Sequence, residues 1–360
     1  MRMRISQPLL IAAALLVVSQ SGARAEADHA AIARASLTQV IRPGYAAFSA
    51  AAGALQGKVA TLCQQPSAAA LREAREAFAG AVAAWSKVEI IRFGPITREH
   101  RFERLFFWPD PKGLGLKQIQ DALAKQEVTV TEPDEIAGKS VALQGLPALE
   151  YLLYGDDGNL LKEDRDFRCR FGLAVATNVD RIANSVVEGW REGSAYEKAF
   201  LGPAPADPYY HAPKEVTLDL FKAFATGLEL VRDQKLGKPL GASPAEAKPK
   251  LAAFWRSGLT FANAAGNLEG VKAIFAQGGF AQVVAQESAG VENSTLFDLD
   301  HAITVLSGID QPIATAVIDE HTRGKLEALR VALKGAGQTA GDMISKGAGL
   351  AFGFNAMDGD

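Results

Sequence analysis

The segment 67–91, SAAALREAREAFAGAVAAWSKVEII, decides the fold class, because its apolar side chains recur with the period of an α-helix. Ser67 follows Pro66, and its hydroxyl is suited to cap the first turn. The charged residues fall mostly on the opposite side of the helix. We therefore predict a helix that packs one face into a hydrophobic core. That face consists of Leu71, Ala74, Phe78, Val82, Trp85 and Val88.

Alanine-rich segments of this kind recur along the whole chain, whereas alternating runs of Val, Ile, Thr and aromatic residues are scarce. The sequence therefore predicts an all-α protein in which antiparallel bundles bury the apolar faces. The proline-rich stretch 200–215, FLGPAPADPYYHAPKE, indicates a connector or domain boundary. The predicted helices lie at 28–62, 67–91, 114–126, 139–155, 165–195, 214–233, 245–265, 268–277, 294–308 and 312–346.

Residues 1–25 have the features of a secretory signal peptide, with Arg2 and Arg4 before an apolar core and a small-residue ending. This segment carries three Arg and no acid, which leaves 35 basic and 41 acidic groups in the mature chain. Because no basic run appears, we exclude nucleic acid as a partner. No later segment is apolar for long enough to predict a transmembrane helix.

Cys63 and Cys169 are the only cysteines of the chain. In an oxidising compartment an isolated pair forms a disulfide more often than a metal site. We therefore predict a disulfide between them. The alternative is two separately buried thiols.

The run GLPALEYLLYG, residues 145–155, contains a single carboxylate, Glu150. On a helix this side chain shares a face with Leu146, Leu153 and Tyr154. A buried, unpaired carboxylate is costly, so Glu150 requires an arginine, a metal ion or a proton. Three interpretations stay open: a structural acid paired with arginine, a metal ligand, and a contact to a bound cargo.

The segment 87–113, KVEIIRFGPITREHRFERLFFWPDPKG, precedes this run and supplies further candidates. His100 and Glu103 form an H-x-x-E whose spacing could place both on one metal ion, although the surrounding charges suggest a solvated face. Trp108 lies before a Pro-Asp-Pro turn, where large aromatics usually pack against a core edge. The arginines available to pair with Glu150 are Arg92, Arg98, Arg101 and Arg104.

The composition of the carboxyl-terminal stretch 347–360, GAGLAFGFNAMDGD, by itself indicates a frayed end, but the stretch also contains bulky apolar residues. We expect Phe352, Phe354 and Met357 to dock back on the body of the protein. Asp358 would then be an acid at a fixed place near the predicted site.

Four stretches occur in order behind the signal peptide: RFGP at 92–95, FFWPDP at 106–111, GLPALEYLLYG at 145–155 and GFNAMDGD at 353–360. Together they resemble the imelysin-like family of bacterial envelope proteins. The resemblance implies two helical bundles related by duplication, with a site in the cleft between them. It also implies export to the periplasm or the outer-membrane face, and association with iron uptake. The family is also classed with the metallopeptidases.

The hallmark of that family is G-x-H-x-x-E, and this chain departs from it. Gly145 and Glu150 match, but Pro147 occupies the position of the histidine. Proline has no ligand atom, so a His-plus-Glu metal pair cannot form here. A catalytic zinc ordinarily needs three protein ligands and a bound water, which argues against peptidase activity.

We therefore divide the chain into a signal peptide (1–25), an amino-terminal bundle (26–200) and a carboxyl-terminal bundle (201–360) whose tail returns to the cleft. The first hypothesis is an exported, non-catalytic protein of iron or haem acquisition, with a small ligand, iron or another divalent metal in the cleft. The alternatives are a metal-dependent peptidase with other ligands, and an envelope module that binds a protein or polysaccharide. The expected cleft residues are Glu150, Tyr154, Arg92, Arg101, Arg104, Trp108 and Asp358.

Overall fold

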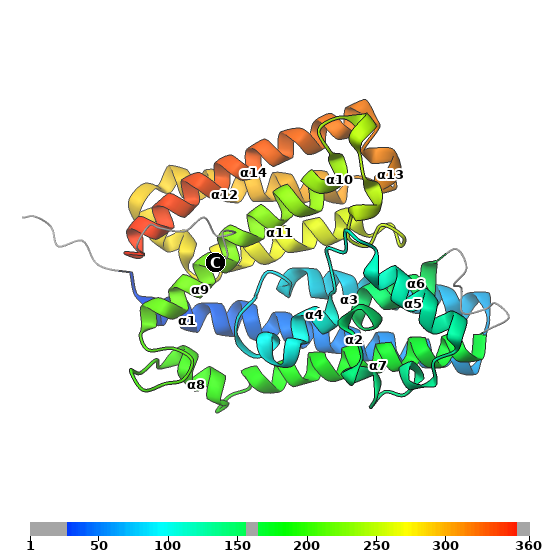
Figure 1. Ribbon diagram of the computed structural model, residues 1–360. Helices are drawn as coiled ribbons and strands as arrows, with labels where there is room; N and C mark the ends of the chain where they lie inside the picture. The colour runs from blue at the N-terminus through cyan, green and yellow to red at the C-terminus, as the bar shows by residue number, and fades with distance from the viewer. Residues whose placement is uncertain (1–26, 156–164, 351–360) are drawn as a thin grey trace, which may run out of the picture.

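The fold is all-α, as predicted (Figure 1). The computed structural model describes residues 27–155 and 165–350, and every regular element in these ranges is a helix. The predicted signal peptide and Asp358 lie outside the described residues. None of the described helices is both long enough and apolar enough to cross a membrane.

The first group of helices comes from the amino-terminal half of the chain and occupies the lower part of Figure 1. Its members are α2 (Arg42–Gln64), α3 (Ala68–Val88), α4 (Arg101–Leu105), α5 (Leu114–Lys125), α6 (Gly145–Tyr154), α7 (Arg165–Trp190) and α8 (Ala195–Leu201). Helix α2 packs against α3 and α7, and α6 packs against α7, α3 and α5. Short 3-10 turns connect them at Gly94–His100, Val128–Thr131, Ile136–Gly138 and Val141–Leu143.

The second group comes from the carboxyl-terminal half and occupies the upper part of Figure 1. Its members are α9 (Pro213–Glu229), the π-helical segment η6 (Leu230–Gly237), α10 (Lys238–Leu240), α11 (Thr260–Ala276), α12 (Phe280–Ser307), α13 (Ile313–Ala316) and α14 (Glu320–Gly347). Helix α12 packs between α11 and α14, and α9 contacts both α11 and α14. Two 3-10 turns, Pro244–Glu246 and Pro249–Leu251, lie before α11.

The two groups meet mainly where α3 packs against α11. Glycines on α11 allow this close approach: a Cβ at Gly270 would lie 2.2 Å from the Lys87 carbonyl oxygen, and one at Gly266 would lie 2.6 Å from Ser86 Cβ. Helix α1 (His29–Ala35) joins the groups a second time, because it packs against α9 and leads through the π-helical Ser36–Ile41 into α2. Helix α1 therefore connects the first helix group, through the chain, to the second, through its packing on α9.

The helix predicted at 67–91 is confirmed as α3, and Ser67 caps it by accepting a hydrogen bond from the Ala70 N–H at 3.1 Å. The helix predicted at 245–265 is wrong. Pro244 and Pro249 each begin only a short 3-10 turn, and the helix starts at Thr260. Pro249 would interrupt a helix that began at 245, and Phe254 and Gly258 have positive φ values of 54° and 74°, which a right-handed helix does not contain.

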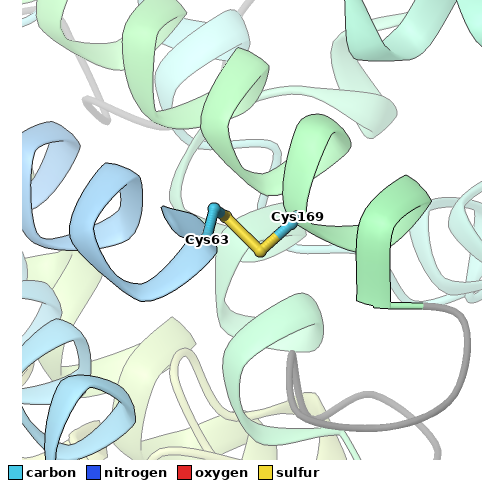
Figure 2. Close-up of a disulfide and its surroundings, with 2 residues drawn as sticks. All are labelled: Cys63 and Cys169. Atoms are coloured by element: carbon cyan, nitrogen blue, oxygen red, sulfur yellow. A yellow bond between two sulfur atoms is a disulfide. The ribbon is translucent and has the colours of Figure 1, made fainter. Parts of the chain in front are cut away.

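The predicted disulfide between Cys63 and Cys169 is confirmed (Figure 2). It joins the last turn of α2 to the first part of α7, with 5.4 Å between the two Cα atoms. The bond therefore fastens two neighbouring helices of the first group whose cysteines are 106 residues apart in sequence.

Candidate functional site

The start of α6 is fixed by a glycine and by a buried amide. Gly145 has a φ of +75°, and a Cβ there would lie 2.3 Å from the backbone oxygen of Leu105, so only glycine fits. Gln144 is fully buried; its side chain donates to the Lys139 carbonyl oxygen at 2.7 Å and accepts from Arg104 Nε at 3.1 Å. These contacts set the direction of α6 and the position of Glu150.

Glu150 is 4% exposed, and its partner is a serine from the second helix group. The Oε1 atom accepts hydrogen bonds from the Ser257 backbone N–H at 2.8 Å and from the Ser257 hydroxyl at 2.7 Å. Burial raises the pKa of the Glu150 carboxyl, while the bonds from Ser257 and the charge of Arg256 act in the opposite direction. Glu150 is therefore a buried acid fixed by two hydrogen bonds from Ser257, with the cation Arg256 nearby. It lies where the two helix groups meet.

The arginines expected opposite Glu150 have other partners. Arg104 Nη2 donates to Asn178 Oδ1 at 3.0 Å, and Arg101 Nη1 donates to the Pro95 carbonyl oxygen at 3.1 Å. The guanidinium of Arg92 lies 4.2 Å from the ring centroid of Phe102. The expected pairing is therefore wrong: these arginines find partners within the first helix group, while Glu150 faces the chain between α10 and α11.

Glu150 borders a cavity of about 290 Å³ between α6 and the residues that precede α11. Pro147 and Tyr151 line the same cavity, so the position of the family's motif histidine faces the same space as Glu150. Arg256 covers one side, with its guanidinium carbon 4.3 Å from the ring centroid of Trp255 and 5.3 Å from that of Tyr151. The cavity thus combines two acids, Glu150 and Asp110, with two cations, Lys250 and Arg256, and aromatic walls.

Trp108 lies at the edge of this cavity and connects the first helix group to the second. Its Nε1–H donates to the Leu251 carbonyl oxygen at 3.1 Å, and its ring stacks on Phe106 with 5.8 Å between centroids. Trp108 is half-buried and also lines two neighbouring cavities. The indole therefore packs against the core and borders open space at once.

Tyr154 lies on α6 but does not line the Glu150 cavity. Its hydroxyl donates to the Arg75 carbonyl oxygen at 3.1 Å, and the Arg75 guanidinium lies 4.7 Å from its ring centroid. Burial raises its pKa to about 12. These contacts direct Tyr154 toward α3, although it lies only one helical turn from Glu150.

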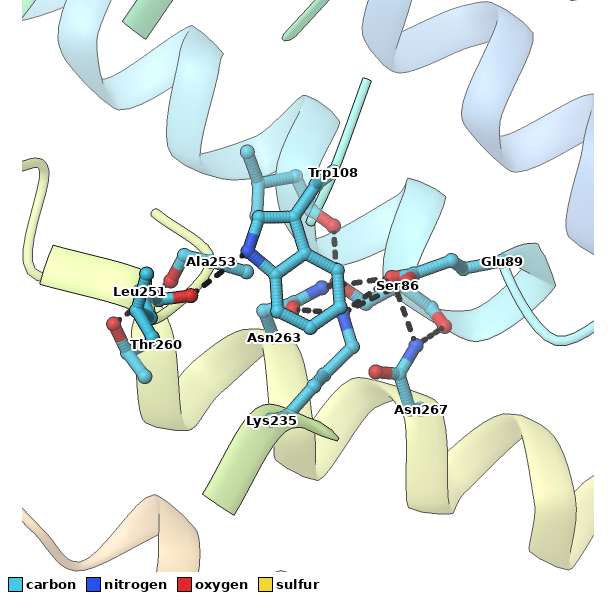
Figure 3. Close-up of polar contacts among 10 residues, drawn as sticks. Ser86, Glu89, Trp108, Lys235, Leu251, Ala253, Thr260, Asn263 and Asn267 are labelled. Atoms are coloured by element: carbon cyan, nitrogen blue, oxygen red, sulfur yellow. Dashed lines mark hydrogen bonds and ion pairs between the residues drawn. The ribbon is translucent and has the colours of Figure 1, made fainter. Parts of the chain in front are cut away.

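A buried polar cluster behind Trp108 was missed by the sequence reasoning (Figure 3). Lys235 reaches from η6 toward Glu89, with Nζ 2.8 Å from Oε1, and toward Asn263. Its Nζ also lies 4.9 Å from the ring centroid of Trp108. Burial lowers the pKa of Lys235, and the Glu89 carboxylate opposes that shift. The cluster consists of Ser86, Glu89, Lys235, Asn263 and Asn267, each of them fully buried.

One sequence signal could have indicated this cluster. Asn263 and Asn267 stand one helical turn apart in the otherwise apolar and glycine-containing run FANAAGNLEG, residues 261–270. Two buried amides on one helix face require polar partners from another element. Lys235 gave no comparable signal, because it lies in a charged stretch that resembles a solvated surface.

The family model for Imelysin, peptidase group M75, matches residues 41–339. The chain belongs to the imelysin family. The resemblance noted from four short motifs is thereby confirmed, and the fold around Glu150 can be described as that of an imelysin.

Individual relatives of this imelysin are distant. Iron-regulated protein A of Synechococcus elongatus is 25% identical over 206 residues, which is 56% of this chain and 52% of that protein. The match thus spans about half the length of the curated relative. An imelysin-like protein of Psychrobacter arcticum has a TM-score of 0.73 at 17% identity, covering 91% of this chain and 97% of the other.

A second solved structure, described as an iron-regulated protein A precursor of Parabacteroides distasonis, has a TM-score of 0.77 at 15% identity. It covers 91% of this chain and 97% of that chain. At such low identity both structures support the fold of this imelysin and nothing finer.

The residues around the Glu150 cavity do not form a set of metal ligands. Pro147 replaces the histidine, and both carboxylate oxygens of Asp110, the other acid of the cavity, accept backbone N–H bonds at 2.8 and 2.7 Å. His100 and Glu103 are exposed and do not line this cavity. Within residues 27–155 and 165–350, no three His, Cys, Asp or Glu side chains come together as a metal site.

Proposed function

We propose that this imelysin is an exported, non-catalytic binding protein of the cell envelope that serves iron or haem acquisition. Its ligand would occupy the cavity beside Glu150. The observation that carries the proposal is the Glu150 carboxylate, buried and held by Ser257, next to Arg256 and aromatic walls. The names of the relatives, iron-regulated protein A in two cases, support the iron-related part.

The chemistry of the cavity favours binding over hydrolysis. Peptide hydrolysis by this family would need a metal-bound water, and Pro147 removes the ligand that the motif assigns to that role. What is left is the hydrogen-bonded Glu150, Asp110 with both oxygens bonded to backbone N–H groups, and apolar surface. The cations Arg256 and Lys250 both lie over the Trp255 ring. Such a combination orients a ligand by a few polar contacts while aromatic surface supplies most of the contact area.

The size of the cavity narrows the kind of ligand. Its volume of about 290 Å³ is close to the lower limit of roughly 300–1,000 Å³ for organic ligand sites. A small iron complex would be enclosed, whereas haem would be held by one edge only. We therefore expect tighter binding of a small ferric chelate than of haem.

The test is titration of the purified mature protein with ferric nitrilotriacetate and with haem, followed by calorimetry and haem absorbance. We expect Glu150→Gln to lose the binding of the ferric chelate while its melting curve stays cooperative. Glu103→Gln is the matched control, because Glu103 is an exposed acid outside the cavity lining. Equal affinity of the wild type and a folded Glu150→Gln variant would exclude this acid from the site.

The same titration distinguishes the peptidase alternative. If His100 and Glu103 hold a metal ion, His100→Ala and Glu103→Gln will lower metal affinity and Glu150→Gln will not. We expect the reverse order, because His100 and Glu103 are both exposed and have no third ligand among the described residues.

A further inference from the structure

A larger cavity lies between Trp108 and the second helix group. We infer that it binds a small organic polyanion with a flat apolar part. Its volume is about 800 Å³, well within the range of roughly 300–1,000 Å³ for organic ligands. The walls come from Trp108 and the following prolines, from η6 and α10, from the loop that follows α10, and from α14. This cavity and the Glu150 cavity share only three lining residues, Trp108, Pro111 and Leu251. Glu150 itself does not line the larger cavity.

The charge of the lining favours an anion. The lining carries three cations, Lys238, Lys248 and Arg330, and one acid, Glu246. The mature sequence as a whole has more acidic than basic residues. The excess of cations around this cavity is therefore opposite in sign to the net charge of the protein. Charge-assisted hydrogen bonds from such groups to carboxylate or phosphate oxygens are about twice as strong as neutral ones.

Helix α10 and the loop that follows it, which carry Lys238 and Lys248, are held in place before any ligand binds. Buried Arg323 donates to the Leu240 carbonyl oxygen at 2.7 Å and to the Gly241 carbonyl oxygen at 3.0 Å. Lys248 donates its backbone N–H to the Pro239 carbonyl oxygen at 2.8 Å, which closes the loop on itself. A preformed wall lowers the entropy cost of ordering the site on binding.

A glycine in η6 makes room for the third cation. A Cβ at Gly237 would lie 3.0 Å from Arg330 Nη2 and crowd the guanidinium. Arg330 Nε donates to the Arg232 carbonyl oxygen at 2.9 Å, which orients the group, while Asp233 lies 3.8 Å away and pairs more closely with Arg232. The π-helical turn thus places Gln234 and Gly237 on the cavity and turns Lys235 into the core.

Trp108 supplies the flat apolar wall. The hydrogen bond from its Nε1 to Leu251 fixes the ring, and Pro109 and Pro111 extend the apolar surface beside it. Planar ligands stack favourably on an immobilised indole. Three cations near one fixed aromatic wall therefore fit a ligand that carries several acid groups on a planar or apolar frame.

The test is isothermal titration with three probes: benzene-1,3,5-tricarboxylate (trimesate), which has acid groups and a ring, citrate, which has only acid groups, and benzoate, which has one acid. We expect trimesate to bind most tightly. The double variant Lys238→Ala/Lys248→Ala and the single variant Arg330→Gln should each weaken trimesate at least about tenfold. Trp108→Leu should weaken trimesate and leave citrate within about twofold.

The control is Lys117→Ala/Lys325→Ala, which removes the same charge from exposed positions outside this cavity. It should bind trimesate as the wild type does, and so should Glu150→Gln, which separates this site from the proposed iron site. The inference is overturned if trimesate fails to bind, if it binds equally well to the double variant or to Arg330→Gln, or if the control loses as much affinity.

Discussion

Lys235 Nζ lies 2.8 Å from Glu89 Oε1 and 2.9 Å from Oε2, and both side chains are completely buried. The pair joins η6 of the second helix group to the end of α3 in the first. Asn263 and Asn267 each donate to Glu89 Oε2 at 3.1 Å, so the carboxylate is surrounded by donors. Because charged groups are costly to bury, this cluster makes one relative position of the two groups much more favourable than any neighbouring one.

Removing the ammonium alone should be strongly destabilising. In Lys235→Met the Glu89 carboxylate stays buried without its cation, and we expect the free energy of unfolding to fall by about 3–5 kcal/mol. The measurement is urea denaturation followed by circular dichroism. The double variant Lys235→Met/Glu89→Leu should recover most of the loss, since it buries no charge. A single variant within about 1 kcal/mol of the wild type would contradict this account.

Glu150 should make stability depend on pH in a defined direction. Burial raises its native pKa above its ordinary value of 4.5, so the native protein keeps this proton when the unfolded chain has released it. The stabilising contribution is complete below the unfolded pKa and is lost as pH rises through the native pKa.

Glu150→Gln removes this ionisation and retains an amide oxygen as acceptor for Ser257. We therefore expect the stability of the variant, relative to the wild type, to increase as pH rises above the ordinary carboxyl pKa of 4.5, and to level off once the native Glu150 has ionised. Thermal melts at a series of pH values test the prediction. A constant difference at every pH would mean that Glu150 ionises in the native protein as it does in the unfolded chain.

Gly145 should tolerate no side chain. Gly145→Ala would force a Cβ against the Leu105 backbone at a positive φ, and we expect a loss of more than about 2 kcal/mol in the free energy of unfolding. Gly80→Ala is the matched control, because Gly80 is exposed in α3 with nothing within 4 Å of the added Cβ. The control should be about 0.5–1 kcal/mol more stable than the wild type. Similar effects of both substitutions would refute the steric argument.

The disulfide should contribute through the unfolded state. Its cysteines are 106 residues apart, and closing a loop of that length is expected to contribute about 4–5 kcal/mol in the chain-entropy model. Cys63→Ala/Cys169→Ala should lose that amount in urea denaturation and show a larger m-value, because its unfolded chain is less compact. Wild type treated with dithiothreitol should match the variant, and an unchanged midpoint would exclude the entropic contribution.

Local signals in the sequence predicted a substantial part of the fold. The apolar period and the Ser67 cap specified α3, since these features act within a few residues of each other. The helix predicted at 139–155 exists as α6 but begins only at Gly145. The number and setting of the cysteines specified the disulfide. The same local reasoning failed between Gly241 and Leu259, where prolines interrupt an alanine-rich stretch and the chain serves as a cavity wall.

The partners of the buried charges were decided by tertiary structure alone. Sequence showed that Glu150 needs a partner, but Ser257 is 107 residues away, and the nearby arginines found closer acceptors. Lys235 looked like a surface residue until η6 turned it toward Glu89, 146 residues before it. A helix forms from contacts within one or two turns, whereas the partner of a buried charge depends on how distant helices pack. Sequence therefore specified most of the helices and the need for a site, and the packing of the two helix groups specified which residues compose it.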